Sequence, residues 1–245
     1  EQFKKKFPDY IHYSESHKNW FFVVPKDRIK KVYDCKSGLQ ELLKVPKKDR
    51  DDYLTLVGEL IEFLTKSGVD SKNLGITHST LLGNYTYGKS DIDVIIYGKD
   101  NGWKILDYLK TAEHKLLKWK DDEEWKEYYQ THKTSEVSHF TEAEYVKHLK
   151  RKKYEGTFDG TVFTLFTVEE PNETWEKWGE ENYEPLGVVT VKGKVVDDYN
   201  SHVRPALYEI ENGEFVGEND FDKLPIKKVV SYSIPFVQQA LKGEV

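Results

Sequence analysis

Two aspartates separated by one residue, Asp91 and Asp93, are the side chains in this sequence best suited to chemistry. Successive side chains of a strand point to opposite faces, so carboxylates at positions i and i+2 lie on one face, a few ångströms apart. Two negative charges at that separation repel each other unless a cation lies between them. Magnesium and manganese prefer oxygen ligands and accept substrate phosphates as further ligands. The pair therefore predicts a site for Mg²⁺ or Mn²⁺ that binds a phosphorylated substrate.

A short turn upstream of the aspartates provides a phosphate site. Ser79 begins the segment Ser79-Thr-Leu-Leu-Gly83, which we expect to be a short helix with free backbone amides and a positive dipole end. The Ser79 hydroxyl adds a further donor. We include the neighbouring His78 and Ser90 among the nucleotide-binding residues, although a histidine near a turn equally often serves as a hydrogen-bonding residue.

The elements that position these residues follow from periodicity. A short strand precedes the turn at residues 73–76, and residues 91–97 form a second strand that becomes wholly apolar, as in a central strand. A third strand is expected at 161–168, after the turn Asp159-Gly160. Helical patterns cover residues 47–67, 100–117 and 121–132, and a capping box at 141–144 opens another helix.

The order of these motifs carries a resemblance. The segment Gly75-Ile-Thr-His-Ser79-Thr-Leu-Leu-Gly83, followed by Ser90-Asp91-Ile-Asp93, resembles the signature of the DNA polymerase beta-like nucleotidyltransferase superfamily. The remainder is similar to an uncharacterised archaeal branch of predicted nucleotidyltransferases, including the tail Gln239-Ala-Leu-Lys-Gly-Glu244. This resemblance implies that Asp91 and Asp93 are catalytic metal ligands and that Ser79 contacts phosphate. It also implies that Gly83 allows the short helix to pack closely.

Two departures from that signature matter. The superfamily usually has glycine before the serine, where this chain has His78. Its third carboxylate should lie on the next strand, yet residues 161–168 contain no acid. Asp159, before that strand, and Glu169, after it, are the alternatives, and the choice depends on a strand direction that the sequence leaves open.

The composition limits the classes of protein and the cellular compartments that we consider. The 245 residues carry a net charge of −6 and one cysteine, Cys35, which excludes an internal disulfide framework and a multi-cysteine zinc site. No apolar run approaches the roughly 20 residues that span a bilayer, so we expect a cytoplasmic protein without a membrane partner.

The expected fold is α/β (α+β), with a short mixed sheet flanked by helices. We divide it into an N-terminal strand-containing extension (1–46), a nucleotidyltransferase-like domain (47–185) and a small beta-rich C-terminal unit (186–245).

The function expected from the resemblance is magnesium-dependent transfer of a nucleoside monophosphate from a nucleoside triphosphate to a hydroxyl acceptor. The acceptor stays open among a small molecule, a protein side chain and an RNA end, and the acidic net charge disfavours long nucleic acids. The missing third acid motivates one alternative, a catalytically inactive nucleotide-binding module. A further alternative is an RNA-binding module that retains the fold.

Overall fold

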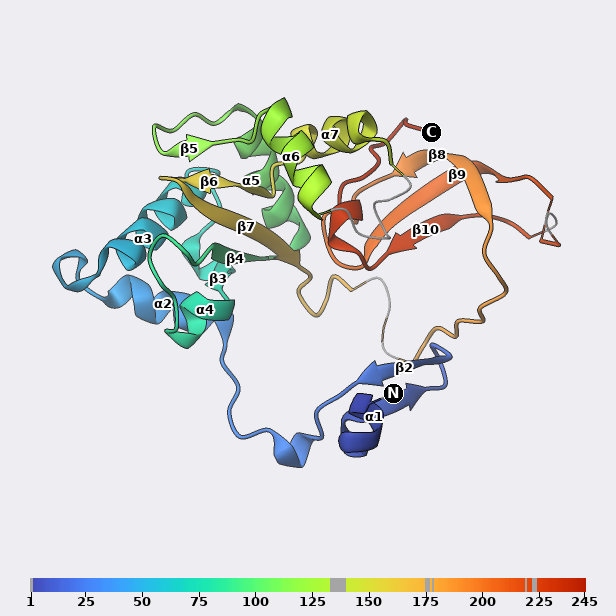
Figure 1. The fold of residues 1–245 in the computed structure, drawn as a ribbon, viewed down its shortest axis with the longest axis horizontal. Helices are drawn as coiled ribbons and strands as arrows, with labels where there is room; N and C mark the ends of the chain where they lie inside the picture. Colours follow the sequence, from blue (N-terminus) through green and yellow to red (C-terminus); the bar gives the residue numbers. More distant parts are fainter. Residues whose placement is uncertain (1, 133–139, 175–176, 178, 219, 222–223) are drawn as a thin grey trace.

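A five-stranded mixed sheet forms the centre of the protein (Figure 1). The computed structural model describes residues 2–132, 140–174, 177, 179–218, 220–221 and 224–245. The strand order is β3-β4-β7-β6-β5, and β4 and β7 are parallel whereas the other neighbours are antiparallel. The strands are β3 (Leu74–Ile76), β4 (Ile92–Tyr97), β5 (Leu117–Lys118), β6 (Glu155–Phe158) and β7 (Thr161–Val168). The expected α/β class with a mixed sheet is confirmed.

One face of this sheet is buried under helices α2 (Cys35–Lys44), α3 (Asp52–Thr65) and α5 (Lys99–Thr111). Alternate residues of β4 and β7 enter this core, including Ile92, Val94 and Phe163, none of which is exposed. Because strand side chains alternate, Asp93 and Ile95 project from the opposite face. The hydrophobic pattern of β4 therefore fixes the face on which the carboxylate lies.

Two helices form a small separate core beside that opposite face. They are α6 (Asp122–His132) and α7 (Glu142–Arg151), packed through the aromatic and aliphatic residues Trp125, Tyr129, Tyr145, Val146 and Leu149. Thr141 caps α7 as expected: its hydroxyl accepts from the Glu144 amide while the Glu144 carboxylate accepts from the Thr141 amide.

The C-terminal unit is an antiparallel sheet of order β10-β9-β8, seen in orange and red in Figure 1. Its strands are β8 (Thr190–Asp197), β9 (Ala206–Val216) and β10 (Lys228–Ser231), followed by the 3₁₀ turn Ile234–Phe236. Buried polar contacts attach this unit to the end of α7, since the Lys152 ammonium donates to the Pro235 carbonyl at 2.5 Å and to Gln239 Oε1 at 2.9 Å.

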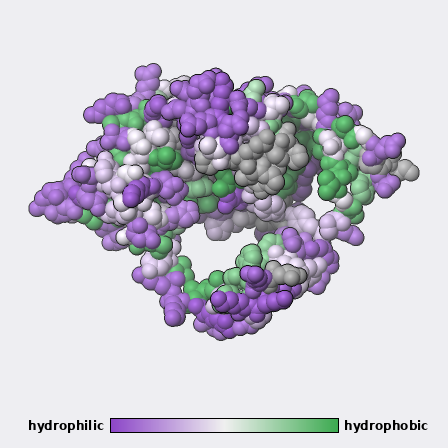
Figure 2. Space-filling model, in the orientation of Figure 1, coloured by the Kyte–Doolittle hydropathy of each residue, from purple (hydrophilic) through white to green (hydrophobic). Residues whose placement is uncertain are grey.

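The first residues form an arm that projects from the body (Figure 1). It contains helix α1 (Gln2–Lys6), the 3₁₀ turns Pro8–Tyr10 and Lys26–Arg28, and the hairpin of β1 (Ile11–Ser14) with β2 (Asn19–Phe22). Figure 2 shows apolar side chains along the arm, and Phe22 is 78% exposed. The arm is tied to the rest of the chain at Ser16, whose carbonyl accepts from the Tyr183 amide.

Several expected boundaries differ from the structure. The helix expected at 100–117 ends at Thr111, and Leu117 instead begins β5. Strand β6 was not anticipated, although it pairs directly with β7 across the turn Asp159-Gly160. Core packing starts before residue 47, because Leu39 of α2 is fully buried in the main core. No helix within the described residues is both long and apolar enough to cross a bilayer.

Candidate active site

The two aspartates lie where β4 begins, next to helix α4 (His78–Leu82). The Thr77 amide donates to the Asp93 carbonyl at 3.1 Å, which brings the start of α4 alongside β4. The His78 backbone is left-handed, with φ of 51°, and its Nδ1 donates to Asp93 Oδ2 at 3.0 Å. A left-handed backbone of this kind is adopted most readily by glycine, so His78 holds a conformation that is unusual for a residue with a side chain. His78 itself contacts the carboxylate.

A buried tyrosine connects three elements behind the aspartates. The Tyr53 hydroxyl, on α3, donates to the Asp91 carbonyl at 2.7 Å. The same oxygen is 2.7 Å from Thr80 Oγ1 on α4, so the Thr80 hydroxyl donates to it. Tyr53 is fully buried, and its ring stacks on Tyr85 at 4.4 Å between centroids. This arrangement fixes the start of β4 relative to α4.

The electrostatics of Asp93 favour a positive partner. Burial raises the pKa of its carboxyl, the hydrogen bond from His78 lowers it, and the charge of Asp91 raises it again. Asp93 is only 7% exposed, whereas Asp91 is exposed. Burial and a neighbouring negative charge both destabilise the ionised form of a carboxyl group. A cation at the free oxygen of Asp93 would stabilise that ionised form.

The aspartates line a pocket of about 340 Å³. Aromatic side chains of the α6–α7 pair form one wall, with Trp125, Tyr128 and Tyr145 among them. The side chains of Thr164 on β7 and Glu155 on β6 also line the pocket. This volume lies in the range of small-molecule sites, which is about 300–1,000 Å³.

The register across the sheet brings Glu155, an acid that the sequence reasoning did not consider, to the pocket of the aspartates. Asp93 lies beside Thr164 of β7, and Thr164 lies opposite Glu155 of β6. These three side chains form a row on one face, with Glu155 about 10 Å from Asp93 at the backbone, since strands are spaced about 4.8 Å apart. The Glu155 carboxylate is 2.5 Å from the Lys120 ammonium. The signal was present in the sequence: a two-residue turn at Asp159-Gly160 places residue 155 opposite residue 164.

The expectation that Asp159 or Glu169 completes the site is wrong. Glu169 follows the last residue of β7, five residues past Thr164, the residue beside Asp93, which corresponds to about 16 Å of strand rise, and neither Glu169 nor Asp159 lines the pocket of the aspartates. Because β7 runs parallel to β4, Glu169 lies at the far end, where its carboxylate is 2.8 Å from the Lys99 ammonium. Asp159 is in the β6–β7 turn, and its amide donates to the Leu116 carbonyl.

The remaining predicted residues lie near the aspartates in different roles. Ser79 is half-buried in the first turn of α4, and Gly83 ends that helix with a left-handed backbone, φ of 69°. Ser90 precedes Asp91, and its hydroxyl accepts from the Thr86 amide at 2.9 Å. That bond fixes the loop before β4. Ser79 and Ser90 do not line the pocket that contains Asp91 and Asp93.

The donor set fits a divalent cation that keeps ligands from its substrate. Asp91 and Asp93 supply hard oxygens on one face, and His78 occupies only one oxygen of Asp93. Across the described ranges, no group of three or more His, Cys, Asp and Glu side chains could hold a metal on its own. Magnesium is commonly bound by one or two carboxylates plus substrate phosphates rather than by an all-protein cage. The chemistry of the pair therefore suits a cation whose remaining ligands come from water or a bound phosphate group.

Comparison with known proteins gives one informative relative. The chain is 33% identical over 247 residues to "Uncharacterized protein MJ1086" of Methanocaldococcus jannaschii. The alignment covers 98% of this chain and 68% of that protein. No protein-family model matches the chain, and no solved structure matches it.

Proposed function

The chain belongs to the same protein family as MJ1086, and we propose that it is a metal-dependent nucleotidyltransferase. The observation that carries the proposal is the placement of Asp91 and Asp93 on one sheet face, at the start of β4 and next to α4, in a pocket of about 340 Å³. A strand carrying two carboxylates beside a short helix is the arrangement that the sequence signature implies for a triphosphate site.

Different residues of the chain would bind the metal ion, the phosphates and the nucleoside. Asp91 and Asp93 would hold Mg²⁺ or Mn²⁺, which when bound neutralises phosphate charge and orients the triphosphate. His78 keeps Asp93 in place through the 3.0 Å hydrogen bond. Ser79, in the first turn of α4, lies outside the lining of this pocket, and its proposed contact with phosphate follows from the sequence resemblance alone. The aromatic wall of Trp125, Tyr128 and Tyr145 offers apolar faces to the nucleoside.

The transfer step needs an acceptor hydroxyl in the same pocket. Its oxygen forms a bond to the α-phosphorus, the bond from that phosphorus to the bridging oxygen breaks, and pyrophosphate leaves. The hydroxyl proton passes to a carboxylate, and Glu155 supports this role because it lines the pocket on the same sheet face as Asp93. Lys120 orients the Glu155 carboxylate before the reaction.

The proposal is tested first by binding. Calorimetry with each of the four ribonucleoside triphosphates should show affinity that depends on Mg²⁺ or Mn²⁺. Asp91→Asn or Asp93→Asn should abolish that dependence and leave the fold intact, because an amide removes the repulsion between the two side chains. Wild-type affinity with unchanged metal dependence in the double variant would show that the aspartates are not the site.

Turnover separates the enzyme from a binding module. With water as the stand-in acceptor, slow release of nucleoside monophosphate and pyrophosphate is expected from the wild type. Glu155→Gln should lower that rate far more than it lowers triphosphate affinity, whereas Asp159→Asn, the matched control, should change neither. A Glu155→Gln variant with the wild-type rate would refute the assigned role of Glu155.

A nucleotide-binding module without turnover is the second candidate. It is favoured by Thr164, a residue without a carboxylate, at the position beside Asp93. Metal-dependent triphosphate binding, with no monophosphate formed over long incubation by the wild type, would support this candidate over the transferase.

A further inference from the structure

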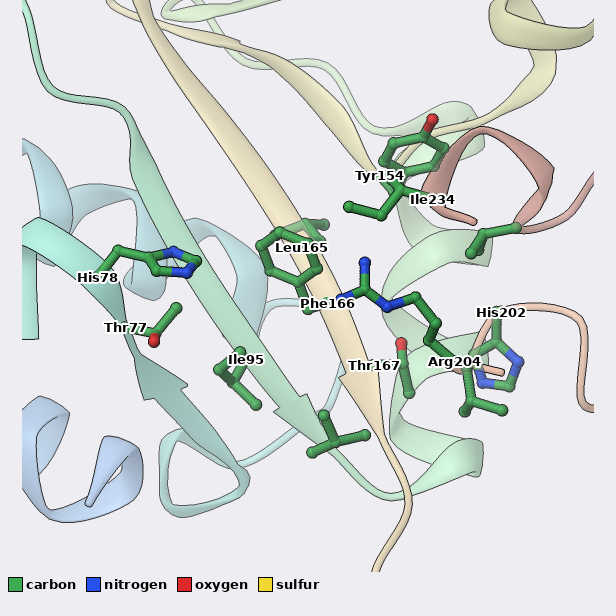
Figure 3. Close-up of a pocket in the computed structure, with 13 residues that line it drawn as sticks. Thr77, His78, Ile95, Tyr154, Leu165, Phe166, Thr167, His202, Arg204 and Ile234 are labelled. Carbon is green, nitrogen blue, oxygen red and sulfur yellow. The ribbon is translucent and has the colours of Figure 1, made fainter. Parts of the chain in front are cut away.

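A second pocket, of about 310 Å³, lies farther along the same sheet face (Figure 3). It is enclosed between β4, β7 and the C-terminal unit, which contributes His202, Val203 and Arg204. In Figure 3 the Arg204 side chain extends into the pocket from the C-terminal unit, and the His78 ring points into it from α4. The pocket thus brings a guanidinium group onto an otherwise largely apolar surface.

The backbone that carries Arg204 is firmly held. Ser201, His202 and Val203 are 0%, 4% and 1% exposed. The Ser201 carbonyl accepts from the Gln238 amide at 2.8 Å, and His202 Nε2 donates to the Lys99 carbonyl at 2.9 Å. The Arg204 side chain is exposed, but the backbone before it is already ordered, so a ligand that binds there need not order that segment.

Arg204 has no acidic partner in the described part of the chain. Arg28 and Arg151 each form an ion pair with a carboxylate, at 2.5 and 2.6 Å, whereas none is formed by Arg204. The remaining lining is mostly apolar, with Ile95, Leu165, Phe166, Val168, Ile234 and Val237 around the cation. A guanidinium exposed to a low-polarity pocket matches the planar oxygens of a carboxylate or a phosphate.

From this arrangement we propose that the pocket binds a small organic anion, with Arg204 holding its carboxylate or phosphate and the apolar walls covering its body. The ligand class is an aliphatic or aromatic molecule that carries one anionic group. The geometry excludes a large polymer inside the pocket, since about 310 Å³ accommodates only a small molecule.

The location of the pocket connects this ligand with the aspartate site. Tyr154, Phe166 and Ile234 line both pockets, so the two are contiguous. The second pocket also reaches Asp93 through His78, which lines that pocket and donates to Asp93 at 3.0 Å. Resting on the proposed function, we assign this small anion as the acceptor, whose hydroxyl faces the aspartate pocket while its anionic group faces Arg204.

The anion site is tested with three probes of similar size: phenylacetate, phenyl phosphate and the neutral benzyl alcohol. Dissociation constants are measured by ligand-observed NMR on the full chain. We expect both anions to bind the wild type about ten-fold tighter than benzyl alcohol, from a charge-assisted hydrogen bond. Comparing the two anions shows whether a carboxylate or a phosphate is preferred.

Two variants and one control locate the effect. Arg204→Gln should remove the preference for the anions, Arg204→Lys should retain part of it, and Arg28→Gln, on the arm, should keep it intact. Equal anion affinity for the wild type and Arg204→Gln would overturn the proposal, as would tighter binding of benzyl alcohol. If circular dichroism showed that Arg204→Gln is unfolded, the other proteins would still test the proposal. Complete loss of the anion preference in Arg204→Lys would refute a site based on charge alone. Equal affinity of the wild type for the anions and for benzyl alcohol would overturn the proposal directly.

The same probes separate this inference from the proposed function. The single variant Asp91→Asn should retain phenyl phosphate binding, because Asp91 lines only the neighbouring pocket, whereas Asp93 is hydrogen-bonded to His78 of the second pocket. If the wild type showed the anion preference but no metal-dependent triphosphate binding, the transferase alone would be rejected. If the wild type bound triphosphate with the metal but showed no Arg204-dependent anion preference, the acceptor site alone would be rejected.

Discussion

Replacing Tyr53 by phenylalanine tests whether the hydrogen bonds behind the aspartates hold the site together. The change removes only the hydroxyl and preserves the ring that stacks on Tyr85. It leaves the Asp91 carbonyl and the Thr80 hydroxyl without their partner, and Thr80 is itself buried. The perturbation is therefore confined to the junction of α3, α4 and β4.

The expected loss of stability follows from the burial of these groups. A buried polar group left without its hydrogen bond costs about 1–3 kcal/mol, so Tyr53→Phe should lower the free energy of unfolding by about that amount. In a chain of this size, each kcal/mol lowers the melting temperature by about 2–4 °C. Urea unfolding followed by circular dichroism measures the first quantity, and calorimetry measures the second.

Tyr85→Phe is the matched control, because it also removes one hydroxyl from the same stacked pair. The Tyr85 hydroxyl donates to Asp51 at 2.8 Å near the surface, where water can replace it. Its removal should change stability by about 0.5 kcal/mol or less. Metal-dependent triphosphate affinity should fall in Tyr53→Phe and persist in Tyr85→Phe. Equal stability and equal affinity for both variants would refute the reasoning that Tyr53 positions the site.

Three further outcomes are expected. Ser79→Ala should weaken metal-dependent triphosphate binding by about 0.5–1.5 kcal/mol in calorimetry, since the backbone amides remain. His78→Gly should be more stable to urea than His78→Val by about 1 kcal/mol or more, because the backbone there is left-handed. The free energy of unfolding should rise between pH 7 and pH 10 and fall above pH 10. Burial lowers the pKa of Lys152 to about 7, and burial raises that of Tyr145 and Tyr208 to about 12.

The sign of the pH dependence comes from proton counts. Between pH 7 and 10 the unfolded chain keeps a proton on Lys152 that the folded chain has released, so stability rises with pH, by at most about 4 kcal/mol over that range. Above pH 10 the unfolded chain releases tyrosine protons that the folded chain keeps, so stability falls. Lys152→Met should flatten the rise. A rise of wild-type size in that variant would contradict the assignment, as would equal stability of the two His78 variants or an unchanged affinity in Ser79→Ala.

The local parts of the site could be predicted because they depend on neighbouring residues. Alternation along residues 91–97 gave the strand and placed both aspartates on one face, and the capping box at Thr141 gave the start of α7. The strand at Thr161–Val168 also followed from its period of two. Each of these patterns is contained within a few residues, so tertiary contacts were not needed to read it.

The residues that face the aspartates across the sheet could not be predicted, because they depend on the direction of β7. A parallel β7 places Thr164 beside Asp93 and moves both proposed acids to the ends of the strand. Glu155 reaches the pocket only through the unrecognised strand β6, and Arg204 reaches the second pocket from a unit about 40 residues later in the chain. Such positions depend on strand pairing and on packing between units, which local patterns do not encode.

The two pockets on this sheet face contain side chains of opposite charge. At one end, burial and the charge of Asp91 raise the pKa of Asp93, and the two negative charges would repel a triphosphate unless a divalent cation accompanied it. At the other end, Arg204 attracts an anion without any metal. Under the proposed function a triphosphate and an anionic acceptor would occupy opposite ends, and their reacting groups would meet at the shared lining of Tyr154, Phe166 and Ile234. An acceptor with one anionic group and one hydroxyl would then be oriented by charge before any reaction occurs, which is the kind of positioning that lowers the entropic cost of a bimolecular transfer.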